Sequence, residues 1–176
     1  MSHNKYTRKP QSKTGEIGTG ENEQLTNVFL QHALTYAAKM KWRVFPCVPR
    51  DKRPLIKAWQ KRATTDPKQI KAWWAQWPDA NVAIATGRGL LVVDVDYRHG
   101  GAESLREMRK AGKVPEDPPI VETPGPGCHL YLSVTKDLKN LVDVMPGVDL
   151  RGAGGYVIAP PSIHPNGLEY QWGVKP

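Results

Sequence analysis

The sequence predicts an α+β domain in which helices flank a mixed or mainly antiparallel sheet. Two observations predict this class. Segments with helical periodicity lie early in the chain, and several short β-like segments lie late. Helices and strands also do not alternate regularly, as they would in a parallel, doubly wound sheet. The 176 residues are enough for one domain with its own hydrophobic core.

The first 24 residues are polar, rich in glycine and poor in large apolar side chains. Such a segment cannot bury enough surface to offset the entropy lost on ordering. We therefore expect a disordered tail over residues 1–24 and one folded domain over residues 25–176. The first helix is expected to use Thr26 as its N-cap and to bury a stripe of apolar residues. These are Phe29, Leu30, Ala33, Ala37 and Met40.

The next elements are a strand and a second helix. Residues 43–48 have β-like composition, with Pro46 at an edge or an end. Asp66-Pro67 is a strong helix start, because Asp is a good N-cap and Pro suits the first helical position. This helix should end near Pro78. It carries Trp73 and Trp77 on one face, which is more typical of core than of a nucleic-acid surface.

Most of the β-like segments follow. We expect strands at residues 81–86 and 90–96, separated by the turn Gly87-Arg88-Gly89, and then a helix over residues 102–110. A hairpin should join residues 120–123 to 128–134 through a Pro-Gly-Pro-Gly turn. The remaining expected strands are residues 148–150, 156–159 and 168–172.

The charge of the chain indicates a polyanionic partner. The formal net charge is +8, and residues 50–71 hold eight basic against two acidic residues, a difference of +6. Trp59, Trp73, Trp74 and Trp77 lie in or beside this stretch. Cationic surfaces with aromatic side chains suit single-stranded nucleic acid. We assign template phosphate contacts to Lys57, Lys61, Arg62 and Lys68.

Two further observations limit the function. Cys47 and Cys128 are far apart and form neither a disulfide framework nor a C-x-x-C motif, so we expect no structural zinc and two small buried side chains. No apolar run approaches the roughly 20 residues that span a bilayer, and the N-terminus has no apolar secretory segment. We expect a cytoplasmic protein without a membrane partner.

Three acids have the pattern of metal ligands. Asp94 and Asp96 end an apolar strand, and the period of two puts both carboxylates on the face opposite Val93 and Val95. Asp149 lies between two apolar residues in the same way. Close carboxylates repel each other, and Mg²⁺ or Mn²⁺ would relieve the repulsion. The alternatives are an acid paired with Arg98 or Arg88, and for Asp149 an ordinary turn residue.

Four motifs stand in a fixed order along the chain. They are Asp94-Val95-Asp96, a turn ending in His129, Val148-Asp149-Leu150-Arg151, and Gly154-Gly155-Tyr156-Val157-Ile158-Ala159-Pro160-Pro161-Ser162. Together with the upstream Lys52-Arg53-Pro54, this set resembles the primase–polymerase family of archaeo-eukaryotic primases found on plasmids, phages and prophages, over about residues 30–172. One departure is Gly127, where the wider superfamily often has Ser two positions before the His.

The resemblance implies an archaeo-eukaryotic primase-like catalytic core and a role for each motif. Asp94, Asp96 and Asp149 would bind two Mg²⁺ or Mn²⁺ ions, and the triphosphate of an NTP or dNTP would contact His129. We add Arg151, Lys52 and Arg88 as further triphosphate contacts, in that order. The activity implied is DNA primase and DNA polymerase on a single-stranded DNA template, together with a helicase domain or a separate helicase.

Two other functions are compatible with parts of the sequence. A metal-dependent glycosyltransferase or nuclease would use the Asp-x-Asp pair, but it leaves the order of His129 and Asp149 unexplained. A non-catalytic DNA-binding module of a replication protein would keep the fold. Three carboxylates near the DNA phosphates would not help such a module to bind DNA.

Overall fold

The structure is a computed structural model that describes residues 27–174 and 176, so the expected tail lies outside the described residues. The helices are α1 (Val28–Lys39), α2 (Trp59–Arg62), α3 (Pro67–Gln76) and α4 (Gly101–Lys110), with a 3-10 helix η1 (Tyr97–His99). The strands are β1 (Arg43–Cys47), β2 (Asn81–Ala85), β3 (Leu90–Asp96), β4 (Ile120–Thr123), β5 (Gly127–Ser133), β6 (Leu141–Met145), β7 (Val148–Arg151), β8 (Tyr156–Ala159) and β9 (Gln171–Val174).

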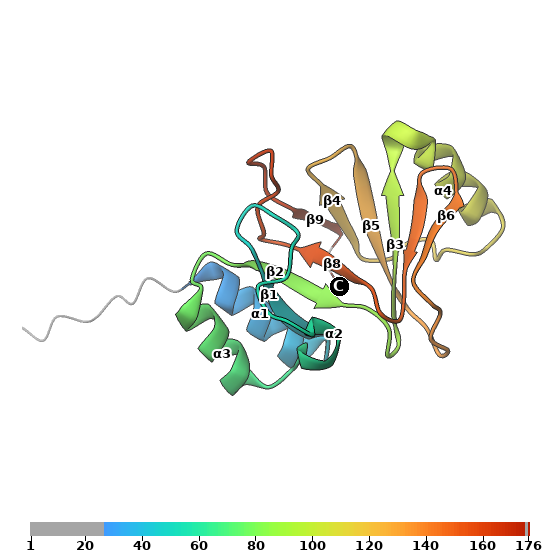
Figure 1. Ribbon diagram of the computed structural model, residues 1–176. Coiled ribbons are helices and arrows are strands. Elements are labelled where there is room, and N and C mark those ends of the chain that lie inside the picture. The colour runs from blue at the N-terminus through green and yellow to red at the C-terminus, as the bar shows by residue number, and fades with distance from the viewer. Residues whose placement is uncertain (1–26, 175) are drawn as a thin grey trace, which may run out of the picture.

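The strands form two antiparallel sheets. The small sheet has the order β1-β2-β8, and the large sheet has the order β6-β7-β3-β5-β4-β9. All seven pairings between these strands are antiparallel, which confirms the α+β class and the antiparallel sheet. In Figure 1 the small sheet lies beside α1 and α3, whereas α4 lies beside the large sheet at the other end of the molecule.

The alternation of β3 divides its side chains between two hydrophobic clusters. Val93 and Val95 pack with Leu105 and Met108 of α4 in the cluster behind the large sheet. On the opposite face, Val92 belongs to the other cluster, which α1, α3 and the small sheet complete. Asp94 and Asp96 continue that face beyond Val92. The acids therefore lie where the hydrophobic packing between the two sheets ends.

The chain passes between the two sheets at residues 86–89, from β2 to β3, and at residues 152–155, from β7 to β8. These two crossing segments pack against each other. The Thr86 hydroxyl after β2 donates to the carbonyl oxygen of Gly152 at 2.7 Å, and its backbone N–H donates to the carbonyl oxygen of Gly155 at 3.0 Å. Gly87 has a φ of +85°, and a Cβ there would lie 2.8 Å from the Cα of Ala153. Only glycine lets the crossings approach this closely, so this contact sets how the two sheets meet.

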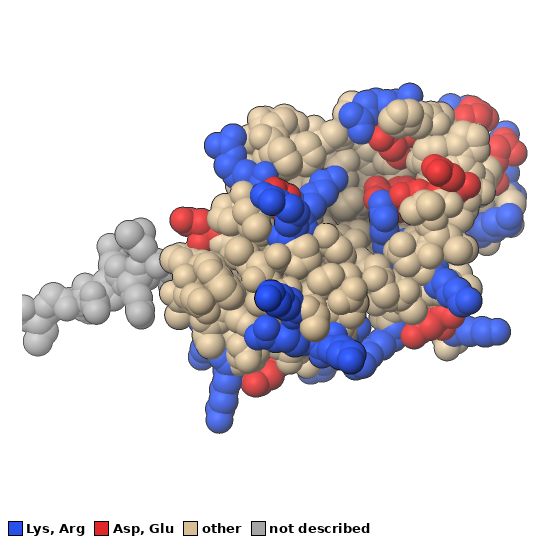
Figure 2. Space-filling model, viewed as in Figure 1, with Lys and Arg blue, Asp and Glu red and all other residues tan. Residues whose placement is uncertain are grey.

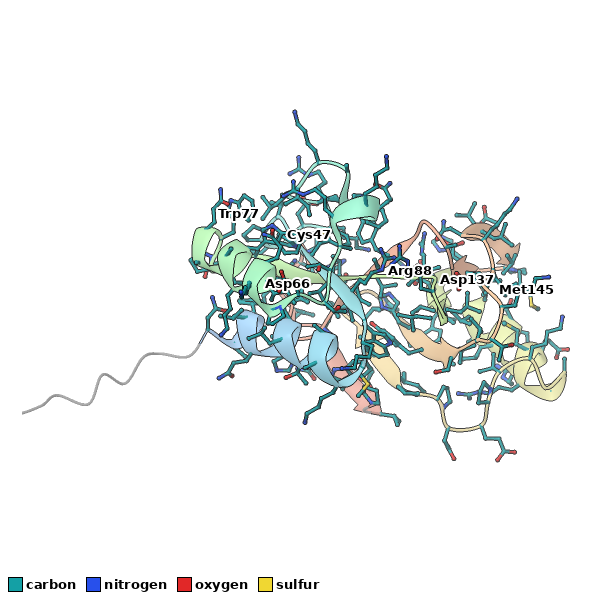
Figure 3. The ribbon with its side chains drawn as sticks, turned by 90° about the horizontal axis from the view of Figure 1, so that it is seen from below. Cys47, Asp66, Trp77, Arg88, Asp137 and Met145 are labelled. Carbon is teal, nitrogen blue, oxygen red and sulfur yellow. The ribbon has the colours of Figure 1, made fainter. Side chains whose placement is uncertain are left out.

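Most of the expected elements are confirmed. The Asp66 side chain caps α3 by accepting from the Lys68 N–H at 3.0 Å, and Figure 3 shows Asp66 and Trp77 at the two ends of this helix. β3 has the expected bounds, and Pro46 lies in β1, an outer strand of its sheet. Cys47 and Cys128 are both buried, in different clusters, as expected of small core residues.

Two expectations about the elements were wrong, and one strand was not expected. The cap of α1 is Asn27 and not Thr26, because the Asn27 Oδ1 accepts the Leu30 N–H at 3.0 Å. The last strand covers Gln171–Val174 and not residues 168–172, since residues 163 and 169 are held in a local bridge before it. β6 was not expected, because it is mostly exposed and has no alternating apolar pattern. No helix in the described part of the chain has both the length and the apolar character needed to cross a membrane.

Candidate active site

Three neighbouring strands bring the predicted acids and the histidine together. Asp94 on β3 is the register partner of His129 on β5 and of Asp149 on β7. Directly opposed residues of an antiparallel pair project from the same face of the sheet. The three side chains therefore form a row across β5, β3 and β7, with Asp96 two positions farther along β3. As expected, Asp94 and Asp96 lie on the face opposite Val93 and Val95, and Asp149 lies opposite Val148 and Leu150, which pack in the cluster with α4.

The row opens into two adjoining cavities, which we call the cleft. A cavity of about 400 Å³ is lined by all three acids, together with Arg98 and Arg151. A second cavity of about 250 Å³ adds His129 and other residues. Lining residues common to both cavities are Lys52, Asp94, Arg151 and Tyr170. Figure 2 shows acidic side chains gathered at a hollow in this face, with basic side chains on either side of it.

Arg151 ties the two register-paired acids to each other. Its Nη2 donates to the Asp94 Oδ2 at 2.9 Å and to the Asp149 Oδ2 at 2.7 Å. Its Nε also donates to the Asp94 Oδ2, at 3.1 Å, and the Asp149 Oδ1 accepts the Asp143 N–H at 2.8 Å. One positive charge thus stands between two partly buried carboxylates. These contacts show that Asp94 and Asp149 are close enough to share one cation.

Asp96 is held by its own neighbours along the chain. Its carboxylate accepts hydrogen bonds from the Arg98 side chain at 2.7 and 3.0 Å, and the His99 Nδ1 lies 3.0 Å away. The guanidinium of Arg98 is the main reason that the pKa of Asp96 lies well below its ordinary value. The pairing of an acid with Arg98, weighed above as an alternative to metal binding, is therefore present for Asp96.

His129 is an uncharged group at neutral pH. It is buried, and burial lowers the pKa of its imidazole to about 4, although the nearby charge of Asp94 opposes this. The His129 Nε2 lies 3.5 Å from the Asp94 Oδ1. Its Nδ1 is buried and has no hydrogen-bond partner within the described residues. His129 therefore brings no positive charge to the cleft, and its Nε2 is the ring nitrogen beside Asp94.

The acids suit a divalent cation by their chemistry, although they are not drawn into one cluster. Within residues 27–174 and 176, no three His, Cys, Asp or Glu side chains are grouped as metal ligands. The reason is visible in the hydrogen bonds, since Arg151 occupies Asp94 and Asp149 while Arg98 and His99 occupy Asp96. Carboxylate oxygens are the donors that Mg²⁺ and Mn²⁺ prefer. Each of the three acids is thus hydrogen-bonded to a cationic side chain, and Asp94 and Asp149 share one.

The structure separates Arg88 from the other candidate nucleotide contacts. Arg88 lies in the turn before β3 and lines a third cavity that has no lining residue in common with the cleft. Asp94 and Asp96 lie near the other end of β3, and at about 3.3 Å per residue the four steps from Leu90, where β3 begins, to Asp94 span roughly 13 Å. Lys52, by contrast, lines both cavities of the cleft.

The basic residues assigned to the template are on the surface and line neither cavity of the cleft. Lys57, Lys61, Arg62 and Lys68 are all exposed. Trp59 begins α2 and lines the second cavity, where its ring stacks on Phe45 at 4.9 Å between ring centroids. Trp73 and Trp74 are buried in the core, as expected for Trp73 from its helical spacing.

Several residues of the cleft were not found from the sequence. Tyr170 lines both cavities, but it belongs to no motif that would indicate a site. Asp143 lies on the unexpected strand β6. Gly127, which differs from the family pattern, has a structural reason: a Cβ at this position would collide with the carbonyl oxygen of Val95 on the neighbouring strand.

An antiparallel sheet with an Asp-x-Asp strand, a histidine on one neighbour and an aspartate on the other has the arrangement expected of a DNA primase/polymerase-type domain. A family model described as "Bifunctional DNA primase/polymerase, N-terminal" matches residues 33–176. The chain therefore belongs to the Prim-Pol family. A search of curated proteins finds no match.

Proposed function

We propose that this domain joins nucleotides on a single-stranded DNA template, acting as a DNA primase and DNA polymerase with two Mg²⁺ or Mn²⁺ ions. The observation that supports this most is the row of Asp94, Asp149 and His129 across three strands, with Asp96 beside it in the same cleft. A neutral histidine next to acids that can share a cation fits a site for a metal–triphosphate complex.

Asp94, Asp96 and Asp149 would hold the ions. When bound, such ions lower the pKa of a 3′-hydroxyl and neutralise a triphosphate and its pyrophosphate leaving group. The residues of the chain contribute position and charge. Asp94 and Asp149 lie on adjacent strands of a paired sheet, so their spacing is fixed by the ladder and not by flexible loops.

Three side chains of the cleft would contact the triphosphate. Arg151 can turn from the carboxylates toward a phosphate, which a guanidinium binds through two parallel hydrogen bonds. Lys52 lines both cavities and supplies a second positive charge. His129 supplies a hydrogen bond from a neutral ring. Arg88 is too far from this group of residues to belong to the same contact.

The template would follow the basic surface beside the cleft. Trp59 lines the second cavity; Lys57, Lys61 and Arg62, within three residues of it in the sequence, are exposed, as is Lys68 in α3. Contacts to phosphates release counterions, so template binding should weaken as salt is raised. A helicase, in the same chain or separate, would supply the single strand.

The test is nucleotide incorporation on single-stranded DNA with Mg²⁺ or Mn²⁺, with and without a primer. The comparison is between wild type and the double variant Asp94→Ala/Asp96→Ala, with DNA binding measured in parallel. Incorporation by wild type that is lost in the variant supports a polymerase, and products without a primer add primase activity.

No incorporation under any of these conditions, with DNA binding intact, would refute the proposed activity. It would favour the non-catalytic DNA-binding module instead. Lys110→Gln is a suitable control, because Lys110 is exposed at the end of α4 and lines neither cavity of the cleft. It should incorporate nucleotides like wild type.

A further inference from the structure

A third cavity lies outside the cleft and collects positive charge. It has a volume of about 230 Å³ and is lined by Lys41, Trp42, Arg43, Thr65, Ala85, Gly87, Arg88 and Leu90. Three of its lining residues are cationic and none is acidic. None of them lines either cavity of the cleft, so the proposed reaction leaves this cavity without a role.

The cations of the third cavity are not fully balanced by the protein. Burial lowers the pKa of Arg43, the charge of Arg88 lowers it further, and Asp137 opposes both. Asp137 also accepts the Gly89 N–H at 2.8 Å, and Figure 3 shows it close to Arg88. One carboxylate thus faces two guanidinium groups, with Lys41 adding a third positive charge. An anion in the cavity would relieve the repulsion that remains.

Two of these cations occupy backbone conformations that favour glycine. Lys41 has a φ of 57° and Arg88 a φ of 54°, both in the left-handed region. Arg88 also lies between Gly87 and Gly89, which have φ values of 85° and 90°. A long cationic side chain is thus held in a turn that glycine would form with less strain. Such conformations are enriched at ligand sites, and at Lys41, the residue after the C-cap of α1, the left-handed conformation also ends the helix.

Helix α2 connects the cleft to the third cavity. At its start, Trp59 lines the cleft. The Arg43 Nη1 donates to the carbonyl oxygen of Gln60 at 3.3 Å, so the next residue of α2 touches a lining residue of the third cavity. Lys61 and Arg62, the next two residues of α2, are exposed. Figure 2 shows basic side chains gathered along the lower part of this face.

We propose that the third cavity binds a backbone phosphate of the single-stranded DNA, at a point that the strand reaches after leaving the cleft along α2. Lys41, Arg43 and Arg88 would contact the phosphate, and Trp42 would lie beside the adjoining sugar or base. The proposal deepens the proposed function, on which it rests for the identity of the strand. The charge of the cavity and its connection to the cleft favour a polynucleotide over a free nucleotide.

The test compares two double variants that each remove two positive charges. Lys41→Asn/Arg88→Asn removes cations of the third cavity, and Asn tolerates the left-handed conformation. Lys110→Gln/Lys113→Gln removes two exposed lysines at and just beyond the C-terminal end of α4. Affinity is measured by fluorescence anisotropy for single-stranded oligonucleotides of about 16 and about 4 nucleotides over a range of salt concentrations. Thermal unfolding establishes that both variants are folded.

The proposal expects a loss that depends on the length of the DNA. Lys41→Asn/Arg88→Asn should bind the longer oligonucleotide about tenfold more weakly, with the slope of log K against log salt reduced by about 0.7 because the contact to one phosphate is lost. Its affinity for the shorter oligonucleotide should stay within about twofold of wild type, since the cleft is intact. The α4 variant should bind both like wild type.

Equal losses in the two double variants, or equal losses for both lengths, would overturn the proposal, as would a wild type that binds neither oligonucleotide. The test is independent of catalysis. A chain that incorporates no nucleotide but has this length-dependent loss refutes the polymerase activity and keeps the phosphate site. A chain that incorporates nucleotides without the length-dependent loss does the reverse.

Discussion

Asp94 on β3 lies directly opposite Asp149 on β7, and a single nitrogen of Arg151 donates a hydrogen bond to both carboxylates. The side chains of Asp94 and Asp149 are only 28% and 24% exposed, so water screens their repulsion poorly. One guanidinium balances one of the two negative charges. The pair therefore remains attractive to a cation of higher charge, which would have to displace Arg151 to bind both acids.

Arg151→Gln should destabilise the protein in a chelating buffer and increase its response to divalent ions. Loss of the guanidinium leaves two partly buried carboxylates facing each other, which should lower the free energy of unfolding by about 1–2 kcal/mol. The same loss removes the competitor for the ion. Thermal unfolding with chelator and then with Mn²⁺ measures both effects, and Mn²⁺ should raise Tm more in the variant than in wild type.

Lys52→Gln is the matched control for Arg151→Gln, because it removes one positive charge from the same two cavities. It should leave the Mn²⁺-dependent rise in Tm close to that of wild type. If Mn²⁺ stabilises wild type and Arg151→Gln equally, Arg151 does not compete with the ion for these acids.

Asp149→Asn should abolish most nucleotide incorporation without weakening the fold. The amide has the shape of the carboxylate, and its oxygen can still accept the Asp143 N–H, but it carries no charge to hold a divalent ion. The hydrogen bond from Arg151 to position 149 is lost, which the removal of the repulsion between Asp149 and Asp94 offsets, and Arg151 keeps its bonds to Asp94. The rate of incorporation should fall by at least about 100-fold. Single-turnover incorporation measures the loss, and affinity for single-stranded DNA should be unchanged or slightly higher.

Asp143→Asn controls for the loss of a negative charge from the same cavity. Asp143 lines that cavity, is exposed, and has a φ of 52° that Asn tolerates. It should keep most of the activity. A parallel loss in both variants would mean that incorporation depends on the charge of the cleft as a whole and not on Asp149 as a ligand.

The row of Asp94, His129 and Asp149 could be predicted from the sequence, because each of these residues lies in a segment with the alternating pattern of a strand. The apolar run ending in Asp94-Val95-Asp96 determines both the element and the side on which the acids lie, because a strand alternates its faces. His129 and Asp149 follow the same rule, each lying between residues that pack in the core. The start of α3 could also be predicted from the sequence, since Asp66-Pro67 acts through local hydrogen bonding alone.

Features that depend on contacts between distant segments could not be predicted. Arg151 and Asp94 are 57 positions apart, and their hydrogen bonds exist only because β7 pairs with β3. The separation of Arg88 from the cleft depends on the direction in which β3 runs. Strand β6 is stabilised by pairing with β7, and its exposed residues have no pattern of their own.

Ser162→Ala should destabilise the small sheet. Strand β2 pairs with β8 through Val82 and Ala159, but the next two residues are Pro160 and Pro161, which have no N–H to donate. The buried Ser162 hydroxyl replaces the backbone hydrogen bonds at this position. It accepts from the Val82 N–H at 2.8 Å and donates to the Val82 carbonyl oxygen at 3.3 Å. Its loss leaves a buried N–H unpaired, at a cost of about 1–3 kcal/mol.

Urea unfolding measures the effect of Ser162→Ala, with the m-value expected to be unchanged. Ser133→Ala is the control, because Ser133 is exposed at the end of β5. Its free energy of unfolding should stay within about 0.5 kcal/mol of wild type. Equal stabilities for the two variants would mean that Ser162 does not replace the missing backbone donor.

His129 should make the stability of the metal-free protein fall as the pH is lowered. Burial, the main cause, lowers the pKa of its imidazole in the folded state to about 4, against an ordinary value of 6.5. Between these values the unfolded chain binds a proton that the folded chain does not, so the stability is fully present above about pH 6.5 and is lost toward about pH 4.

From about pH 7 to about pH 5 the loss due to His129 should be about 2 kcal/mol. Urea unfolding of His129→Gln in chelating buffer should have a pH dependence smaller by this amount than that of wild type. If His129→Gln loses as much stability as wild type between the two pH values, the imidazole is not held neutral by burial in the cleft.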